Sequence, residues 1–264
     1  MKTYIVIIAT ILIGSALFAS SYNERRAIAL SGDTKAPGGV INKSAEVIVQ
    51  SGAYIIISGA GNYISEGSGS LPGAGSISLT GDFINNNSFS NPISPTVTIR
   101  FDGQSRQSIS GNQFSLGNVV INNPTELSLD CNLIISGTLT VAETAGVIIM
   151  TDSDLSVDGE VSGTPNVFIS GTAVLGELGE NANVSIESTS PMGLPSLMNN
   201  LVVNPGEASE YILPNSTSVS NINFTSGALI IGEHALLIRT KDLILSGDRS
   251  EERRVGKECR FRWS

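Results

Sequence analysis

The richest concentration of groups that could do chemistry is acidic and lies at residues 151–160, with the sequence TDSDLSVDGE. Ca²⁺ prefers oxygen ligands in proteins, so Asp152, Asp154 and Asp158 are candidate ligands of a Ca²⁺ site. Residues i and i+2 of a strand share a face. Asp152 and Asp154 would therefore also suit the paired carboxylates that glycoside hydrolysis requires. The third interpretation is that these side chains and Glu160 are solvated charges on turns and outer faces.

The surroundings of these carboxylates disfavour catalysis. No Lys or Arg occurs between Arg106 and Arg239, so no side chain there would neutralise a uronate or help to transfer its proton. We predict no catalytic residues and no required cofactor. Solvated charge is the favoured interpretation of the acidic segment, ahead of a Ca²⁺ site and of catalytic carboxylates.

The other reactive side chains are isolated. His234 is the single histidine; it cannot form a zinc site alone, no Gly-x-Ser-x-Gly elbow accompanies it, and we predict that it lies in a turn. Cys131 follows a short apolar run and is predicted to be a small buried hydrophobe. The Gly-rich stretch 59–75 lacks the Gly-Lys-Ser/Thr sequence and the helix that a phosphate-binding loop needs, so it is predicted to be a Gly/Ser-rich loop.

Short strands would have to position these groups. From about residue 45, short apolar runs follow one another, such as Val119–Ile121, Leu133–Ile135, Val167–Ile169 and Ala173–Leu175. Gly, Asn, Asp, Ser or Pro separates almost every pair of runs, which is typical of strands joined by tight turns. No run is long enough for an amphipathic helix, and the chain is predicted to be all-β.

A longer repeat accompanies the strands. The segments NVVIN (118–122) and NLVVN (200–204) begin two blocks that match in sequence. Strands this short bury a core only when they stack coil upon coil, about 4.8 Å apart. We predict a right-handed parallel β-helix, or β-solenoid, over residues 76–248, with an N-terminal cap and first rungs at 21–75. The alternative is an array of β-sandwiches.

The two ends differ in composition from the rest. Residues 1–20 combine Lys2 with an apolar run from Tyr4 to Phe18, which indicates a signal peptide. The run is shorter than the roughly 20 residues of a spanning helix, so no membrane span is expected after its removal. Residues 249–264, RSEERRVGKECRFRWS, resemble translated sequencing-adapter DNA. We predict that this tail is not native and that the natural protein continues beyond residue 248.

The chain is strongly acidic between these ends. Without residues 1–20 and 249–264, 8 of the 15 basic and 21 of the 24 acidic side chains remain, so the formal charge changes from −9 to near −13. Nucleic-acid binding depends on cations that replace phosphate counterions, so nucleic acid is excluded as a partner. A polysaccharide or a cell-surface protein remains as the expected partner.

Two blocks, 97–141 and 197–238, resemble the β-solenoid regions of large Gram-negative surface proteins that are exported by the type IX route. The resemblance is carried by FDGQSRQSISG (101–111), by NVVINNP, by the Gly before TLTV and ALII, and by IGEHALLI, with GDFINNNSF (81–89) in the same style. It covers about residues 75–247. Such proteins are usually treated as adhesin-like or structural and generally carry a C-terminal sorting domain, which implies secretion or display on the outer cell surface.

Together these features predict an exported, non-catalytic surface scaffold or adhesin-like repeat protein. The alternative is a carbohydrate-binding or polysaccharide-degrading β-helix protein, to which the acidic segment at 151–160 points.

Overall fold

The computed structural model describes residues 27–31, 39–43, 47–87, 93–187, 193–204, 210–225, 228–239, 244–245, 250–255 and 258–263, with the backbone alone at 27–31, 43, 244–245, 250–255 and 258–263. These residues form strands and turns without a helix. The described ranges accordingly offer no helix that could cross a membrane. The predicted signal peptide at residues 1–20 lies outside them.

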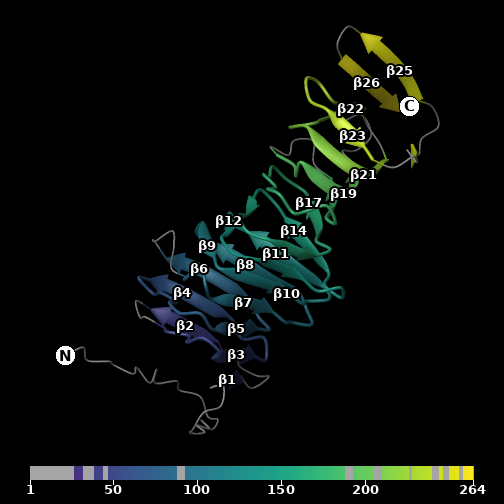
Figure 1. Cartoon of the computed structure of the whole chain (residues 1–264). Coiled ribbons are helices and arrows are strands. Elements are labelled where there is room, and N and C mark those ends of the chain that lie inside the picture. The colour runs from purple at the N-terminus through teal and green to yellow at the C-terminus, as the bar shows by residue number, and fades with distance from the viewer. Residues whose placement is uncertain are drawn as a thin grey trace.

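The strands stack as successive rungs of one elongated column of about nine turns (Figure 1). Three parallel sheets, which we call A, B and C, form its faces. Sheet A contains, in spatial order, β1 (Ala27–Ser31), β3 (Tyr54–Ser58), β5 (Ser76–Leu79), β7 (Thr98–Phe101), β10 (Asn118–Ile121), β13 (Leu139–Val141) and β16 (Val161–Gly163).

Sheet B is the longest and runs along most of the column. It contains β2 (Val40–Lys43), β4 (Tyr63–Gly67), β6 (Phe83–Asn87), β8 (Gln107–Gly111), β11 (Glu126–Asp130), β14 (Val147–Met150), β17 (Asn166–Ile169), β18 (Asn183–Ile186), β19 (Leu197–Val203), β21 (Thr217–Phe224) and β23 (Leu236–Ile238), with β24 (Ile244–Leu245) also paired to β21. Sheet C contains β9 (Phe114–Leu116), β12 (Leu133–Ile135) and β15 (Leu155–Val157).

The register shows that the rungs are nearly regular in the middle of sheet A and are shorter from β17 to β19. Val119 pairs with Ile99 in the preceding rung and with Leu139 in the next, at equal separations in the sequence. Val167 and Val184 in sheet B are register partners that lie closer together in the sequence. Every pairing within sheets A, B and C is parallel. The predicted parallel β-solenoid is therefore confirmed, and the β-sandwich alternative is wrong for the described residues.

Alternation of side chains explains why these sequences form rungs. In β7 and β10 every second side chain is buried, so a column of Ile77, Ile99, Val119 and Leu139 packs inside sheet A. β-Branched side chains suit this pleated and half-buried surface. Stacking supplies the apolar contacts that a single short strand could not make.

Aromatic side chains form a second column in the core of the N-terminal half. The Phe83 ring stacks on the Tyr63 ring at a centroid distance of 5.2 Å and on the Phe114 ring at 5.4 Å. All three side chains are almost completely buried. Such stacked pairs contribute about 0.5–1.5 kcal/mol beyond the burial of area.

Several strands were missed because polar residues point inward. Asn42, Ser65 and Asn85 are register partners on β2, β4 and β6, and all are buried. The stretch 59–75, predicted as a loop, thus contains β4. Conversely, Ala173–Leu175 takes part in isolated bridges and is not a strand. The apolar pattern alone does not identify strands whose inward residues are hydrogen-bonded amides and hydroxyls.

The match between the blocks that begin at 118–122 and at 200–204 does not reflect the structural repeat. The segment 118–122 begins with β10 of sheet A, whereas 200–204 lies in and just after β19 of sheet B. Segments that match in sequence therefore lie on different faces. The structural repeat is the single rung, which is much shorter than the offset between the blocks, and the blocks resemble each other because all rungs use the same residue types.

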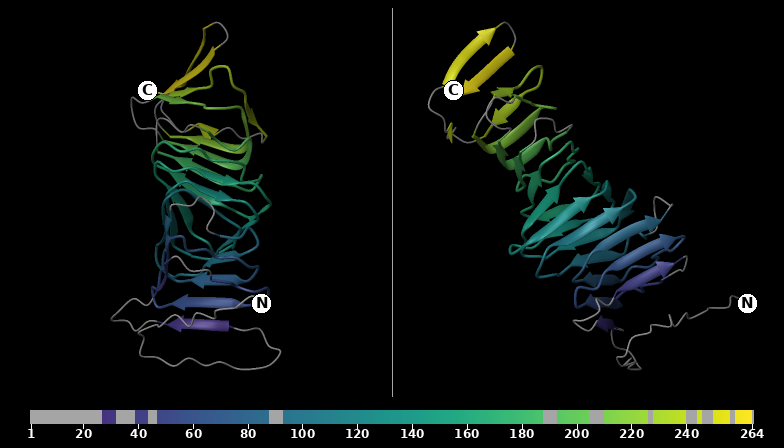
Figure 2. Two further views of the ribbon diagram at one scale, coloured as in Figure 1. Left: turned by 90° about the vertical axis from the view of Figure 1, so that its left-hand side faces the viewer. Right: turned by 180° about the vertical axis from the view of Figure 1, so that it is seen from behind.

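A small mixed sheet adjoins the last rungs at the C-terminal end of the column (Figure 2). It contains β20 (Glu210–Ile212), β22 (Ala228–Ile230), β26 (Glu258–Trp263) and β25 (Ser250–Val255) in that order. β25 and β26 form an antiparallel hairpin, and β26 also pairs antiparallel with β22. The segment 249–264, which is predicted to be non-native, thus has strand backbone over most of its length, and its origin stays a prediction.

Two buried tyrosines differ in the partner of the hydroxyl group. The Tyr63 hydroxyl accepts a hydrogen bond from Asn42 Nδ2 at 3.1 Å, whereas the Tyr211 hydroxyl has no partner within the described part of the chain. A buried polar group without a partner destabilises by about 1–3 kcal/mol. We expect Tyr63→Phe to lower the free energy of unfolding by about 1 kcal/mol, and Tyr211→Phe to leave it unchanged or raise it by up to about 1 kcal/mol. Guanidinium denaturation measures both, and equal losses at the two positions would contradict this expectation.

Candidate functional site

Residues 151–154, the first part of the acidic segment, form a corner of the column between β14 and β15. Ser153 points inward, where it is buried and donates a hydrogen bond to the Leu129 carbonyl oxygen at 2.8 Å. Asp152 and Asp154 on either side of Ser153 face outward. The φ angle of Asp152 is 51°, a left-handed conformation that aspartate tolerates better than most residues. Both carboxylates therefore point outward at a turn and not within a strand.

Both carboxylates hold the next rung in place. Asp152 Oδ1 accepts hydrogen bonds from the Thr172 backbone N–H at 2.8 Å and from the Thr172 hydroxyl at 2.9 Å. Asp154 Oδ1 accepts a hydrogen bond from the Val174 backbone N–H at 2.8 Å. Hydrogen bonds to a charged acceptor are stronger than those between neutral groups. The two carboxylates thus have a structural role between rungs.

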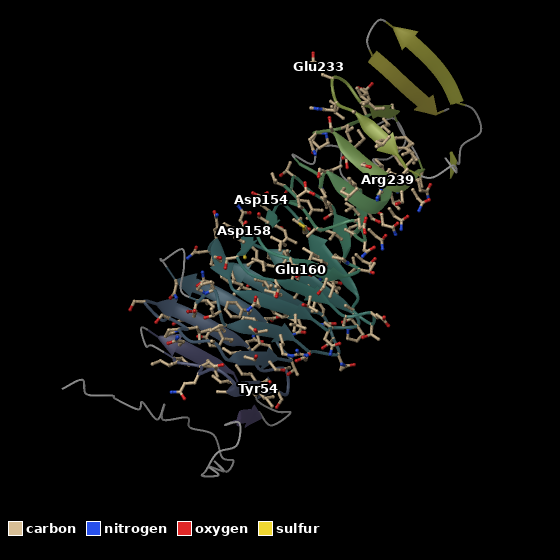
Figure 3. All side chains as sticks on the ribbon, viewed as in Figure 1. Tyr54, Asp154, Asp158, Glu160, Glu233 and Arg239 are labelled. Carbon is tan, nitrogen blue, oxygen red and sulfur yellow. The ribbon has the colours of Figure 1, made fainter. Side chains whose placement is uncertain are left out.

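The remaining acidic residues of the segment are distributed around the column. Asp158 follows β15 in sheet C, whereas Glu160 immediately precedes β16 in sheet A, and both are exposed. Figure 3 shows Asp154 and Asp158 towards one edge of the column and Glu160 farther from that edge. Among the residues whose side chains are described, no group of three or more His, Cys, Asp or Glu could hold a metal ion. The geometry therefore gives no support to a Ca²⁺ site at Asp152, Asp154 and Asp158.

A shallow groove of about 290 Å³ lies on the outer face of sheet C. Its lining crosses successive rungs, because Ile134 pairs with Ser156, and Leu155 bridges to Leu175 beside Gly176. The outward-facing residues of the lining are Gln113, Asn132, Ile134, Asp154, Ser156 and Val174. Gly176 keeps the groove open, because a Cβ atom there would lie 3.2 Å from the Leu155 carbonyl oxygen and above Ser156.

The negatively charged side chain that lines this groove has no ion-pair partner among the described residues. The ion pairs between described side chains join Arg100 to Asp102 at 3.2 Å, Arg106 to Glu126 at 2.8 Å and Arg239 to Glu180 at 3.9 Å. None of these pairs includes a residue of the groove. The Asp154 carboxylate therefore faces the groove without a cationic partner among the described residues.

A second polar cluster lies on the outer face of sheet A, around Asp102. Its Oδ2 atom accepts hydrogen bonds from the Ser78 hydroxyl at 2.7 Å and from Arg100 Nε at 3.2 Å, and its Oδ1 atom accepts one from Asn122 Nδ2 at 3.2 Å. Partial burial alone would raise the pKa of Asp102, but the bonds from Ser78, Arg100 and Asn122, together with the Arg100 charge, outweigh burial and lower this pKa. The cluster connects three rungs, and the Arg100 cation within it balances the charge of the Asp102 carboxylate.

The motif FDGQSRQSISG has an equally structural explanation. Gln107 is completely buried and donates through Nε2 to the carbonyl oxygens of Leu79 at 3.1 Å and Gly81 at 2.6 Å. Its Oε1 atom accepts hydrogen bonds from the Gly103 N–H at 2.8 Å and from Asn123 Nδ2 at 3.0 Å. Buried amides need such partners. Most of these partners lie on neighbouring rungs, so the motif itself did not reveal this role.

Sheet B carries an asparagine ladder that sequence reasoning also missed. Asn166, Asn183, Asn200 and Asn221 are register partners on successive rungs. Each side chain from Asn183 onward donates through Nδ2 to Oδ1 of the preceding asparagine, at 2.8, 2.5 and 2.9 Å. The nearly regular spacing of these four asparagines along the sequence was the available signal.

The isolated reactive residues lie where the sequence placed them. His234 is exposed in the turn between β22 and β23, and its backbone N–H donates to the Ile231 carbonyl oxygen at 3.2 Å. Cys131 is free and buried, with 8% of its surface exposed. Both predictions are confirmed.

Cys131 is expected to be unreactive in the folded protein. Burial, with a smaller contribution from the nearby Asp130 charge, raises the pKa of the Cys131 thiol to about 12, and the thiolate is the reactive form. In a Cys259→Ser variant, which removes the other cysteine, we expect a disulfide reagent at pH 8 to modify the folded protein at least about a hundredfold more slowly than free cysteine. Modification at the free-cysteine rate without denaturant would contradict this burial.

The chain matches no protein-family model, no curated protein and no solved structure. Its resemblance to type IX-exported surface proteins, and the export that this implies, therefore stay predictions.

Proposed function

We propose that the chain is a non-catalytic, exported surface scaffold of the adhesin-like kind, whose column presents long polar faces to polysaccharide or cell-surface protein partners. The observation that supports this proposal is the commitment of outward polar side chains to bonds between rungs. The asparagine ladder from Asn166 to Asn221, together with the Asp152 and Asp154 carboxylates, connects rung to rung. These bonds stiffen an extended body along its axis.

The proposed location is supported by sequence features. Residues 1–20 have the pattern of a signal peptide, and a formal charge near −13 between the predicted ends favours solubility outside the cell. The resemblance of residues 75–247 to type IX-exported surface proteins agrees with display on the outer surface. In such a scaffold many weak contacts along the column would add up, as in multivalent binding.

Adhesion under flow tests this proposal. The full chain is coupled to beads at graded density, and bead retention is measured on surfaces coated with a panel of polysaccharides and cell-surface proteins. We expect retention to rise steeply with bead density on at least one surface. Single conservative changes of exposed residues, such as Asp152→Asn or Glu233→Gln, should shift the required density by less than about twofold, because each contact is weak.

Cleavage of a polysaccharide by the protein would contradict the scaffold proposal. The same preparation is incubated with the polysaccharides of the panel, and new reducing ends and unsaturated uronates are measured. We expect neither product. Either product, or a single surface substitution that abolishes retention on every surface, would overturn the scaffold proposal in favour of a polysaccharide-degrading enzyme or a single convergent site.

A further inference from the structure

The groove on sheet C is lined by both apolar and polar side chains. Ile134 is half-buried and Val174 is 36% exposed, so both offer apolar surface to the groove. Gln113 and Asn132 supply amide groups, and Asp154 supplies a carboxylate. An aliphatic chain that ends in a cation would meet both requirements, because Lys and Arg cover apolar surface with the stem while the charged head remains in a polar setting.

The charge of Asp154 is not needed for its structural role. In the preceding rung Asn132 occupies the equivalent place, and its Oδ1 atom accepts a hydrogen bond from the Asp154 N–H at 3.0 Å. Asp154 Oδ1 makes the same bond to the Val174 N–H at 2.8 Å. An amide oxygen therefore suffices to connect the rungs. The negative charge at 154 is additional, and it faces a groove that has no cation of its own among the described residues.

We propose that this groove binds an extended peptide segment of a partner protein that carries a lysine or arginine side chain. The aliphatic stem would pack on Ile134 and Val174, the cationic head would approach the Asp154 carboxylate, and the peptide backbone would bond to the amides of Gln113 and Asn132. The groove lining contains no aromatic side chain on which a sugar ring could stack, which favours a peptide over a glycan. The inference rests on the proposed scaffold function and gives that scaffold the chemistry of one partner.

Methyl NMR of the full chain tests the proposal. The probe is a capped peptide of alternating alanine and lysine, measured at low ionic strength because exposed ion pairs are screened by salt. The same peptide with acetylated lysines and a neutral oligosaccharide are the comparison probes. We expect the lysine peptide to shift the methyl resonances of Ile134 and Val174, whereas those of the distant, exposed Ile41 and Leu237 stay in place.

Three variants separate the contributions to binding. Asp154→Asn keeps the oxygen that accepts the Val174 N–H and removes the charge, so we expect about threefold weaker binding with the fold retained. Asp152→Asn is the matched control, because Asp152 bonds to Thr172 in the same way but does not line the groove; its affinity should stay within about 1.5-fold of the parent. Gly176→Val places a side chain above Ser156 and should weaken binding at least about fivefold by filling the groove.

Defined outcomes would overturn the inference. Equal shifts with the acetylated peptide, equal losses for Asp154→Asn and Asp152→Asn, or no shift at Ile134 and Val174 each contradict a cationic partner. Shifts with the oligosaccharide alone would assign the groove to a glycan. The NMR experiment detects peptide binding in solution at named methyl groups, so its outcome is independent of the bead experiment. The methyl resonances can stay in place while the beads still adhere. They can also shift even where polysaccharide cleavage disproves the scaffold function.

Discussion

Replacing Phe83 with alanine will lower the free energy of unfolding by about 3–5 kcal/mol, the range typical of large aromatic side chains removed from a core. Phe83 is completely buried, and its ring stacks between those of Tyr63 and Phe114 at 5.2 and 5.4 Å. Its removal leaves a cavity between two rungs that cannot collapse, because the backbones of both rungs are held by their sheets. Guanidinium denaturation followed by circular dichroism measures the loss.

The control for this prediction is an exposed apolar side chain in the same sheet. Ile41 on β2 is 59% exposed, so Ile41→Ala should change the free energy of unfolding by no more than about 0.5 kcal/mol. Similar losses for the two variants would show that Phe83 contributes no more than an ordinary surface residue. The aromatic column would then not be a principal source of stability in the N-terminal rungs.

The second large effect is expected from Gly111→Ala. Gly111 has a φ angle of +106°, and an added Cβ atom would overlap the carbonyl oxygen of Asn85, its register partner on β6. A left-handed conformation destabilises a residue with a side chain by about 1–2 kcal/mol, and overpacking against a fixed backbone adds about 1–3 kcal/mol. We therefore expect Gly111→Ala to lower the free energy of unfolding by about 3 kcal/mol or more. The same denaturation experiment measures this change.

Gly179→Ala separates the two causes. Gly179 has a φ angle of +78°, yet an added Cβ atom would meet no atom within 4 Å. Gly179→Ala should therefore lower the free energy of unfolding only by the conformational contribution, which is about 1–2 kcal/mol. If both alanine variants lose the same amount, the close approach of β6 and β8 has no energetic consequence.

Sequence reasoning succeeded where burial follows apolar alternation. Ile99, Val119 and Leu139 belong to short apolar runs that turn residues separate, and this pattern predicted strands that stack in a solenoid. It failed at Ser65 and Gln107, which are polar and yet buried. Polar residues can enter a core only with a hydrogen-bond partner, and the partners here lie mainly on other rungs, far away in the sequence. A local pattern contains no information about such a partner.

The large separation in sequence between partners on neighbouring rungs also limited the prediction of the candidate site. The sequence identified Asp154 as a residue of interest but assigned it to solvent, to a Ca²⁺ site or to a carboxylate pair, since its partner Val174 belongs to the next rung. The groove was equally hidden, because Ile134, Asp154 and Gly176 come from three successive rungs. Cys131 could be predicted because burial of a small apolar side chain depends only on its own alternating run.

The shortening of the rungs towards β17, β18 and β19 has a mechanical consequence. Register partners such as Val167 and Val184 are closer in sequence than the partners of earlier rungs, which leaves too little chain for strands in all three sheets. Sheet C continues there only as single bridges, so fewer backbone bonds cross each level of the column. When an adhering particle pulls on the molecule, we expect this waist to yield first. It would then absorb work while the N-terminal rungs, which have strands in all three sheets, stay folded.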